Sequence, residues 1–370
     1  MNILITFLTA HKNTFGGVEK SIFSLIDGLR KTNNNVYVYT SINDDHLENF
    51  FYSKYLDCNF NCLENEIDNE IRKTYLKYEL EINNELEKII LENNIEYVLI
   101  IDQLWGIIPN INFKNKYNVK MGILYHMTFQ PDLIIKSLNN RYNNYFAVSN
   151  EVRNKIIQFT NTQIKIDILP NCYIPEDYNE IGNKDGNYIF CNSRLAEGKG
   201  IENLLSVYKD IVIKYPDLKL NLCGGEFHFG KRDKILNIIY SFKMLNPSIA
   251  DKIKVIDKLN WDEIPNNIKN SKMIVLPTSY ETFGIAALES IACCKPLITT
   301  NVGNLPNLVE NSGILVDYNN KQQLYYAIIK VLDDDVLKNR LKRNCKTVRK
   351  KYTSIYIANK LLNYIQGSEL

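Results

Sequence analysis

The sequence has no excess of either charge and no long hydrophobic run. Its 44 lysine and arginine residues are balanced by 42 aspartate and glutamate residues, which excludes a strongly basic nucleic-acid-binding protein on bulk electrostatics. The apolar stretch at residues 2–10 lacks a basic flank and a cleavage site, and it is too short to cross a bilayer. We therefore expect a soluble, cytoplasmic protein that binds no nucleic acid, and any association with the inner face of a membrane would be peripheral.

Groups of metal-ligating residues are also scarce. The 8 cysteines show no secreted disulfide framework, which favours a reducing compartment. Cys58 and Cys62 are spaced like half of a metal site, but no second cysteine or histidine pair lies nearby. Asp333, Asp334 and Asp335 fit the D-x-D pattern of metal-dependent transferases, yet they lie between two helical patterns, where aspartate is an ordinary cap. We predict no metal and no cofactor.

Short apolar runs alternate with longer helical patterns along the whole chain, which is typical of parallel α/β sheets. The strands predicted in the first half are Ile3–Phe7, Val36–Tyr39, Tyr97–Ile101, Val119–Leu124, Tyr145–Val148 and Ile166–Leu169. The pattern then restarts, with strands predicted at Tyr188–Asn192, Leu218–Cys223, Lys254–Ile256, Met273–Pro277, Leu297–Thr300 and Ile314–Val316. Helices are expected at residues 18–30, 66–92, 334–351 and 355–365, the second of them as a surface helix rather than a coiled coil.

A linker separates the two series of strands. The segment from Leu169 to Pro175 carries two prolines and is followed by a polar stretch. We predict two Rossmann-like, doubly wound parallel-sheet domains that face each other across a cleft, at residues 1–172 and 173–353. A C-terminal helix at residues 354–370 is expected to pack back on the first domain. Ligand crevices in such domains lie at the carboxyl ends of the strands.

Two glutamates eight positions apart follow a buried strand in the second half. The strand ends at Pro277, a short turn holds Glu281, and an apolar helix that contains Glu289 begins near Phe283. Free amides and the helix dipole at Phe283 and Gly284 offer a phosphate site. A carboxylate can accept from both hydroxyls of a ribose cis-diol. By spacing alone, the pair could equally be a helix-start charge and a solvated helix residue.

Other polar segments follow strands in the same way. Arg194 and Lys199 flank a turn that opens a helix, and their guanidinium and ammonium groups suit phosphate oxygens. Gly16 and Gly17 follow the first strand and let the backbone approach a ligand, although the spacing matches neither a Rossmann fingerprint nor a P-loop. His126 also follows a strand, and a structural histidine remains an open alternative for it.

Together these segments resemble the retaining GT-B glycosyltransferases of family 4, the glycosyl transferases group 1. The resemblance lies in the E-x7-E segment with its Phe-Gly pair, the R-x4-K-G turn, the Gly-Gly loop, the histidine after a strand and the Leu169-Pro170-Asn171 hinge. It covers nearly the whole chain and is strongest in the second half. The chain departs from the family at Cys294, where glycine is usual, and at Cys223-Gly224-Gly225, where the family has a more regular G-x-G.

The resemblance implies a GT-B fold with an acceptor-binding first domain and a donor-binding second domain. It implies that Glu289 holds the ribose, that Arg194 and Lys199 stabilise the departing diphosphate, and that Glu281 and His126 lie at the transferred sugar. Further donor contacts implied in the same way are Gly16, Gly17, Gly225, Glu226, Lys258, Leu259, Phe283, Gly284 and Ile285.

The implied function is transfer, with retained anomeric configuration and without a metal, of a sugar from a UDP- or GDP-sugar. The implied acceptor is a carbohydrate, a lipid-linked molecule or another molecule, in surface polysaccharide or glycoconjugate synthesis. Two alternatives stay open. One is a catalytically inactive GT-B subunit that binds nucleotide or a partner protein, against which the presence of both glutamates and both cations argues. The other is another GT-B enzyme, such as a sugar-nucleotide epimerase.

Overall fold

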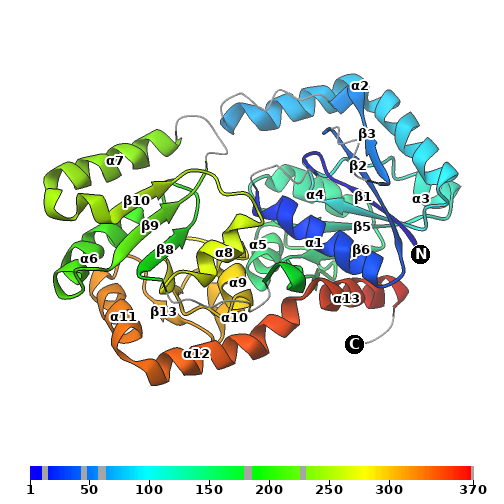
Figure 1. Cartoon of the computed structure of the whole chain (residues 1–370). Coiled ribbons are helices and arrows are strands. Elements are labelled where there is room, and N and C mark those ends of the chain that lie inside the picture. The colour runs from blue at the N-terminus through cyan, green and yellow to red at the C-terminus, as the bar shows by residue number, and fades with distance from the viewer. Residues whose placement is uncertain (11–15, 43–47, 57–63, 179–185, 226–230, 368–370) are drawn as a thin grey trace. The chain divides into compact units, whose positions relative to one another are not determined.

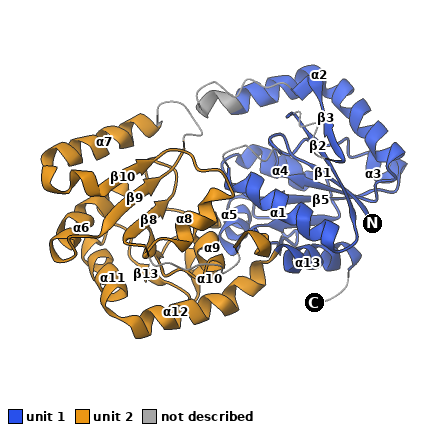
Figure 2. Cartoon of the chain, viewed as in Figure 1, with its two compact units in different colours: residues 1–172, 354–370 blue, residues 173–353 orange. Residues whose placement is uncertain are grey.

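The chain folds into two compact units, shown in a computed structural model that describes residues 1–10, 16–42, 48–56, 64–178, 186–225 and 231–367 (Figure 1). Unit 1 comprises residues 1–172 with 354–370, and unit 2 comprises residues 173–353 (Figure 2). Among the described helices, none combines the length and the apolarity that a membrane span needs.

Unit 1 is built on a 7-stranded parallel sheet in the order β3-β2-β1-β4-β5-β6-β7. Its strands are β1 Asn2–Thr6, β2 Asn35–Thr40, β3 Phe50–Tyr52, β4 Tyr97–Ile101, β5 Lys120–Tyr125, β6 Asn144–Ala147 and β7 Asp167–Ile168. All residues of the central strand β4 are buried, as expected for a parallel strand covered on both faces. The strand order reverses between β1 and β4, so a ligand crevice is expected at their carboxyl ends.

The helices of unit 1 connect these strands, and the last one returns from the C-terminus. They are α1 Gly17–Lys31, the 3₁₀ turn η1 Lys54–Leu56, α2 Glu64–Glu92, α3 Phe113–Lys116, α4 Pro131–Asn139, α5 Asn150–Thr160 and α13 Ser354–Gln366. A Cβ on Gly28 of α1 would lie 2.1 Å from the carbonyl oxygen of Ser354, and the Ser354 hydroxyl donates to Asp27 at 2.9 Å. The C-terminal helix is therefore an integral part of unit 1.

Unit 2 repeats the design with a 6-stranded parallel sheet in the order β10-β9-β8-β11-β12-β13. Its strands are β8 Tyr188–Asn192, β9 Lys219–Cys223, β10 Ile253–Ile256, β11 Met273–Leu276, β12 Leu297–Thr300 and β13 Ile314–Val316. Its helices are η2 Pro175–Tyr178, α6 Ile201–Lys214, α7 Lys231–Leu245, η3 Pro247–Lys252, α8 Glu263–Lys269, α9 Ile285–Ala292, α10 Leu305–Val309, α11 Lys321–Asp333, α12 Asp335–Val348 and η4 Arg349–Tyr352. Here the order reverses between β8 and β11, which sets the expected crevice at their ends.

The structure confirms the doubly wound fold and every strand that the sequence predicts, each within one residue of its expected bounds. It adds β3, a three-residue edge strand that is too short to show an alternating pattern. The long charged helix α2 is present, with a non-helical residue at Tyr78 that divides it. Helix α9 begins at Ile285, two residues later than expected.

Candidate active site

The R-x4-K-G turn and the segment before α9 lie side by side at the reversal point of the unit 2 sheet. The first follows β8 and the second follows β11. The Ser279 amide donates to the Gly198 carbonyl at 2.7 Å. A Cβ on Gly200 would lie 2.0 Å from the Pro277 carbonyl oxygen. Gly198 and Gly200 have φ values of 79° and 69°, a region that glycine enters without strain. These glycines therefore let the two turns meet.

Lys199 and Glu281 join the two turns through their side chains. The Lys199 ammonium forms an ion pair with the Glu281 carboxylate, and both side chains are largely shielded from solvent. Arg194 lies in the same turn as Lys199 but is exposed, and no ion pair holds it in the part of the chain that the structure describes. The sheet edge therefore carries one paired and one accessible cation.

Glu289 lies within α9 and is only 5% exposed, so the solvated-residue alternative for it is wrong. The Tyr178 hydroxyl donates to its Oε1 at 3.0 Å, and the Asn192 amide donates to its Oε2 at 3.1 Å. Burial, followed by the charge of Glu289, raises the pKa of Tyr178 well above its usual value. Tyr178 keeps its proton and remains a donor. Sequence reasoning did not find this partner, whose only signal was its place just after the linker.

The turn before α9 is held in a conformation that only glycine adopts easily. Gly284 has a φ of 99° and immediately precedes the helix. The side-chain amide of Asn304 donates to the Phe283 carbonyl at 3.2 Å, and the Asn304 backbone amide donates to the Glu281 carbonyl at 3.1 Å. Asn304 therefore clamps the turn, while the first amides of α9, from Ile285 on, have no carbonyl partner inside the helix. The expected phosphate site shifts from Phe283 toward Ile285.

The predicted nucleotide-side residues lie at the ends of β9 and β10. A Cβ on Gly224 would lie 2.1 Å from the Ser193 carbonyl oxygen, so the turn that contains Gly225 abuts the turn of Arg194. Lys258 is exposed, and Leu259 is half-buried beside it. Glu226 lies outside the described residues.

In unit 1, Gly16 and Gly17 mark the start of α1. A Cβ on Gly16 would fall 1.7 Å from Oε2 of Glu19, so a side chain at residue 16 would displace that carboxylate. Glu19 is buried, and the Thr9 hydroxyl donates to its Oε1 at 2.8 Å. Burial raises the pKa of Glu19. The Gly-Gly turn therefore packs directly against the buried carboxyl group of Glu19, a residue that the sequence did not single out.

His126 follows β5 and is 3% exposed. Its Nε2 lies 3.0 Å from Oδ1 of Asn171, and its Nδ1 lies 3.6 Å from Oδ2 of Asp102, which follows β4. Burial lowers the pKa of His126 to about 4, against the hydrogen bond with Asn171. The histidine is therefore neutral near pH 7 and is held inside unit 1. Asp102 is a partner that the sequence did not single out.

The three aspartates that fit D-x-D are engaged in other interactions. Asp333 pairs with Lys214 at 2.9 Å, Asp334 caps α12 by accepting from the Leu337 amide at 2.8 Å, and Asp335 pairs with Lys338 within α12. The capping role expected for this segment is confirmed for Asp334. Cys58 and Cys62 lie outside the described residues.

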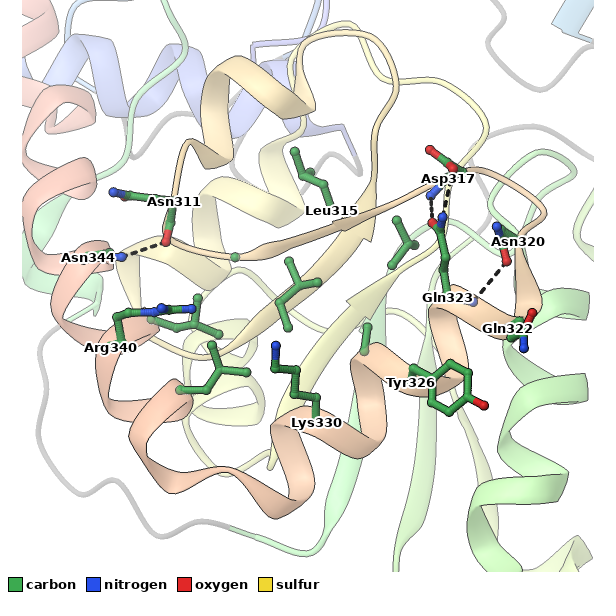
Figure 3. Close-up of a pocket in the computed structure, with 16 residues that line it drawn as sticks. Asn311, Leu315, Asp317, Asn320, Gln322, Gln323, Tyr326, Lys330, Arg340 and Asn344 are labelled. Carbon is green, nitrogen blue, oxygen red and sulfur yellow. Dashed lines mark hydrogen bonds between the residues drawn. The ribbon is translucent and has the colours of Figure 1, made fainter.

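A separate cavity of about 1020 Å³ opens between β13, α11 and α12 in unit 2 (Figure 3). Lys330 and Arg340 line it from the two helices, and Gln323 holds Asp317 at its other end. None of the residues predicted to bind the donor lines this cavity. The candidate site is therefore defined by hydrogen bonds and ion pairs at the ends of β8 and β11, not by this hollow.

In the comparison with known proteins, the second half of the chain matches a family model. The family model "Glycosyl transferases group 1" matches residues 175–348. An uncharacterized glycosyltransferase of Methanocaldococcus jannaschii is 29% identical over 157 residues, 42% of this chain and 41% of that protein. The capsular polysaccharide biosynthesis glycosyltransferase CapM of Staphylococcus aureus is 29% identical over 196 residues, 52% of this chain and 49% of that protein. The chain thus spans half or less of the length of these relatives.

Solved structures match over the whole chain. Sucrose-phosphate synthase from Thermosynechococcus elongatus superposes with a TM-score of 0.76 at 14% identity, covering 99% of this chain and 98% of that one. The Anabaena protein HepE in complex with UDP-glucose superposes with a TM-score of 0.73 at 15% identity, covering 99% and 100%. Identity this low shows the fold alone, which is GT-B. Residues 175–348 therefore match the glycosyl transferases group 1 family, in a chain that has the GT-B fold.

Proposed function

We propose that this chain is a retaining glycosyltransferase of family 4 that transfers a sugar from a nucleoside diphosphate sugar to an acceptor. The observation that carries the proposal is the ion pair of Lys199 with Glu281 and the hydrogen bond of Asn192 with Glu289 at the ends of β8 and β11, with Arg194 in the same turn as Lys199. This edge combines two cations, the amino terminus of α9 and two carboxylates within one unit. A nucleoside diphosphate sugar presents phosphates, a ribose diol and sugar hydroxyls, which are the groups that such a set can bind.

In this proposal the diphosphate lies against Arg194, Lys199 and the first amides of α9. Neutralising charge on the departing diphosphate lowers the barrier to breaking the glycosidic phosphate bond. Lys199 pairs with the Glu281 carboxylate and so keeps it near the phosphates, where it can accept from hydroxyls of the sugar. These cations also make a metal ion unnecessary, so we propose a metal-independent enzyme that needs no cofactor.

Glu289 is proposed to hold the ribose. Its two oxygens accept hydrogen bonds from Tyr178 and Asn192. A carboxylate offers about four acceptor positions, which suits the two hydroxyls of a ribose cis-diol. The two protein donors hold the carboxylate in place before the ligand arrives, which reduces the entropy that binding costs.

The names of related proteins support a nucleotide-sugar donor. HepE was solved with UDP-glucose, and a relative from Corynebacterium glutamicum that is 25% identical over 156 residues is named as GDP-mannose-dependent. CapM is named for capsular polysaccharide biosynthesis. We propose a UDP- or GDP-sugar as donor and a carbohydrate or lipid-linked acceptor in surface polysaccharide or glycoconjugate synthesis.

We also propose a cytoplasmic location with peripheral association at the inner face of the membrane. Residues 336–351 contain eight lysines and arginines and no acidic residue. Arg340, Arg343, Lys346 and Lys350 lie on the exposed face of α12 and η4, a pattern that anionic lipid headgroups attract. Sedimentation with vesicles tests this: binding to anionic but not to neutral vesicles is expected, and equal binding to both would contradict it.

The donor proposal is tested by thermal unfolding with a panel of nucleotides and nucleotide sugars. A ligand at 100 times its dissociation constant adds about 2.7 kcal/mol of stability, so a bound donor raises the unfolding temperature clearly. We expect one nucleoside diphosphate and its sugar to stabilise the protein and, at the same concentration, to stabilise Glu289→Gln much less. If no member of the panel stabilises the protein, the donor assignment is wrong.

A further inference from the structure

Three buried polar side chains meet in unit 1 from three separate segments. Asp102 follows β4, His126 follows β5, and Asn171 lies at the end of the residues assigned to unit 1 before the chain enters unit 2. Their exposed fractions are 1%, 3% and 4%. Polar groups so deeply buried are stable only if they are hydrogen-bonded, so the position of each proton matters.

Asp102 adopts an unusual backbone conformation that aims its carboxyl group at His126. Its φ is 63°, in the left-handed region that few residues other than glycine adopt. The His126 amide donates to its Oδ1 at 2.7 Å, and the Met127 amide donates to the same atom at 3.3 Å. Oδ1 is therefore fully used, and the carboxyl group is fixed against the first residues after β5.

The other carboxyl oxygen faces the imidazole ring without a hydrogen bond. Oδ2 of Asp102 and Nδ1 of His126 are both buried and lack a hydrogen-bond partner, and they lie 3.6 Å apart. That distance is slightly too long for a hydrogen bond, and a small rotation of either side chain closes it. A proton shared by these two atoms spares both of them the cost of desolvation. The Leu124 backbone is a further hydrogen-bonding group at the ring, and it raises the pKa of His126 against the effect of burial.

The partner of Nε2 and the burial of the pair decide where that proton lies. Asn171 presents its carbonyl Oδ1 to His126 Nε2, so Nε2 carries a hydrogen. An ionised pair would place two charges in a buried site, which is costly without further donors. Burial raises the pKa of Asp102 to about 7 and lowers the pKa of His126 to about 4. Tyr125, which also senses the Asp102 charge, has its pKa raised by burial and stays neutral.

We propose that Asp102 is a positioning residue whose neutral carboxyl group donates from Oδ2 to Nδ1 of His126. This bond fixes the histidine as the tautomer with a hydrogen on Nε2, and Nε2 in turn holds Asn171. The resulting series of hydrogen bonds joins Asp102, His126 and Asn171 and anchors the segment that leads out of unit 1. The part of the inference in which His126 serves sugar transfer rests on the proposed function, whereas the proton arrangement does not.

Nitrogen NMR of the imidazole rings tests the proton arrangement directly and needs no activity. The chain has only 4 histidines, and His126→Gln identifies the relevant signals by their loss. At pH 6 we expect a neutral His126 ring with hydrogen on Nε2 and a bare Nδ1. A hydrogen on Nδ1, in either a neutral or a charged ring, would overturn the proposal.

Asp102→Asn provides the second test, because asparagine tolerates the left-handed region and its amide can donate where the acid does. We expect this variant to keep the Nε2–H tautomer. If Asp102 were instead an ionised acceptor, the substitution would move the hydrogen away from Nδ1, so a change of tautomer would contradict the proposal. Asp132→Asn changes an exposed carboxylate of the same unit and should leave the His126 signals unchanged.

A kinetic measurement separates this role from the proposed function. Asp102→Ala should reduce the kcat of sugar transfer at least 10-fold while changing the KM for the donor less than 3-fold, because the groups proposed to hold the diphosphate and the ribose lie in unit 2. An unchanged kcat in a folded variant with an altered His126 tautomer would refute the catalytic part alone. Absence of transfer by the unsubstituted protein would instead count against the proposed function.

Discussion

Replacing Glu289 by glutamine should separate ribose recognition from folding. The Tyr178 hydroxyl can still donate to the new amide oxygen, as it does to Oε1 at 3.0 Å. Asn192 can rotate its own amide, because its Oδ1 has no partner in the described structure, and can then accept from the new NH₂ group. The fold therefore loses little, and we expect less than about 1 kcal/mol of unfolding free energy to disappear.

Donor binding should lose far more than the fold does. In the proposed complex, Glu289 accepts two charge-assisted hydrogen bonds from the ribose, each of about 1.5–3 kcal/mol, and glutamine offers neutral bonds of about 0.5–1.5 kcal/mol. The expected loss is about 2 kcal/mol, or roughly a 30-fold rise in Kd. Glu289→Ala should in addition destabilise the fold, because the buried Tyr178 hydroxyl and the Asn192 amide each lose a hydrogen bond to the carboxylate, at about 1–3 kcal/mol apiece.

Calorimetric titration with the nucleoside diphosphate, together with urea unfolding, measures both quantities on the same variants. Glu202→Gln is the matched control, because Glu202 is an exposed residue at the start of α6 in the same unit, and it should change neither. Donor affinity in Glu289→Gln that equals that of the unsubstituted protein would refute ribose binding by this helix, whatever happens to the stability.

Further predictions concern the charges. Arg194→Ala and Lys199→Ala should lower turnover more than donor affinity, because the charges of Arg194 and Lys199 matter most as the diphosphate departs. A near-normal kcat of both variants in steady-state kinetics would refute the leaving-group assignment. Transfer should survive EDTA, and a loss restored by manganese or magnesium would contradict metal independence. For Asp102, the folded pKa of about 7 lies above the ordinary 3.8, so between these values the native state holds a proton that the unfolded chain releases. The stability that this group contributes is therefore lost as the pH rises from about 4 to 7. Asp102→Asn should therefore gain stability relative to the unsubstituted protein over that window, by up to about 1.4 kcal/mol per pH unit. If the difference between their free energies of urea unfolding does not change with pH, the raised pKa is wrong. For His126, the folded pKa of about 4 lies below the ordinary 6.5. Its contribution to the free energy of unfolding is therefore present above pH 6.5 and is lost as the pH falls toward 4. His126→Gln should accordingly gain stability relative to the unsubstituted protein as the pH falls, which is the opposite of Asp102→Asn.

The fold could be predicted because the buried strands of each domain appear in the sequence as short apolar runs. Strands such as β4 and β8 are continuous apolar segments between polar turns, and their alternation with helices dictates parallel pairing. The edge strand β3 has three residues and no such signature. The start of α9 was misjudged because Phe283 and Gly284 continue the apolar run, although the left-handed Gly284 ends the turn rather than beginning the helix.

The candidate site could be predicted only where charge and spacing form a motif. Arg194, Lys199, Glu281 and Glu289 stand in such motifs, and their roles stay predictions until donor binding is measured. The supporting partners were not predictable, because they are single residues far away in the sequence. Tyr178 is 111 positions from Glu289, and Asp102 is 24 positions from His126. Only the folded sheet brings such pairs together.

Proton NMR during turnover of an α-linked nucleotide sugar tests the proposed retaining transfer, because it follows both cleavage of the donor and the configuration of the product. We predict release of the nucleoside diphosphate and a first-formed product with an α anomeric proton, and loss of both in Lys199→Ala. A β product would contradict the retaining assignment. No cleavage of any UDP- or GDP-sugar in the presence of acceptors would contradict the glycosyltransferase itself.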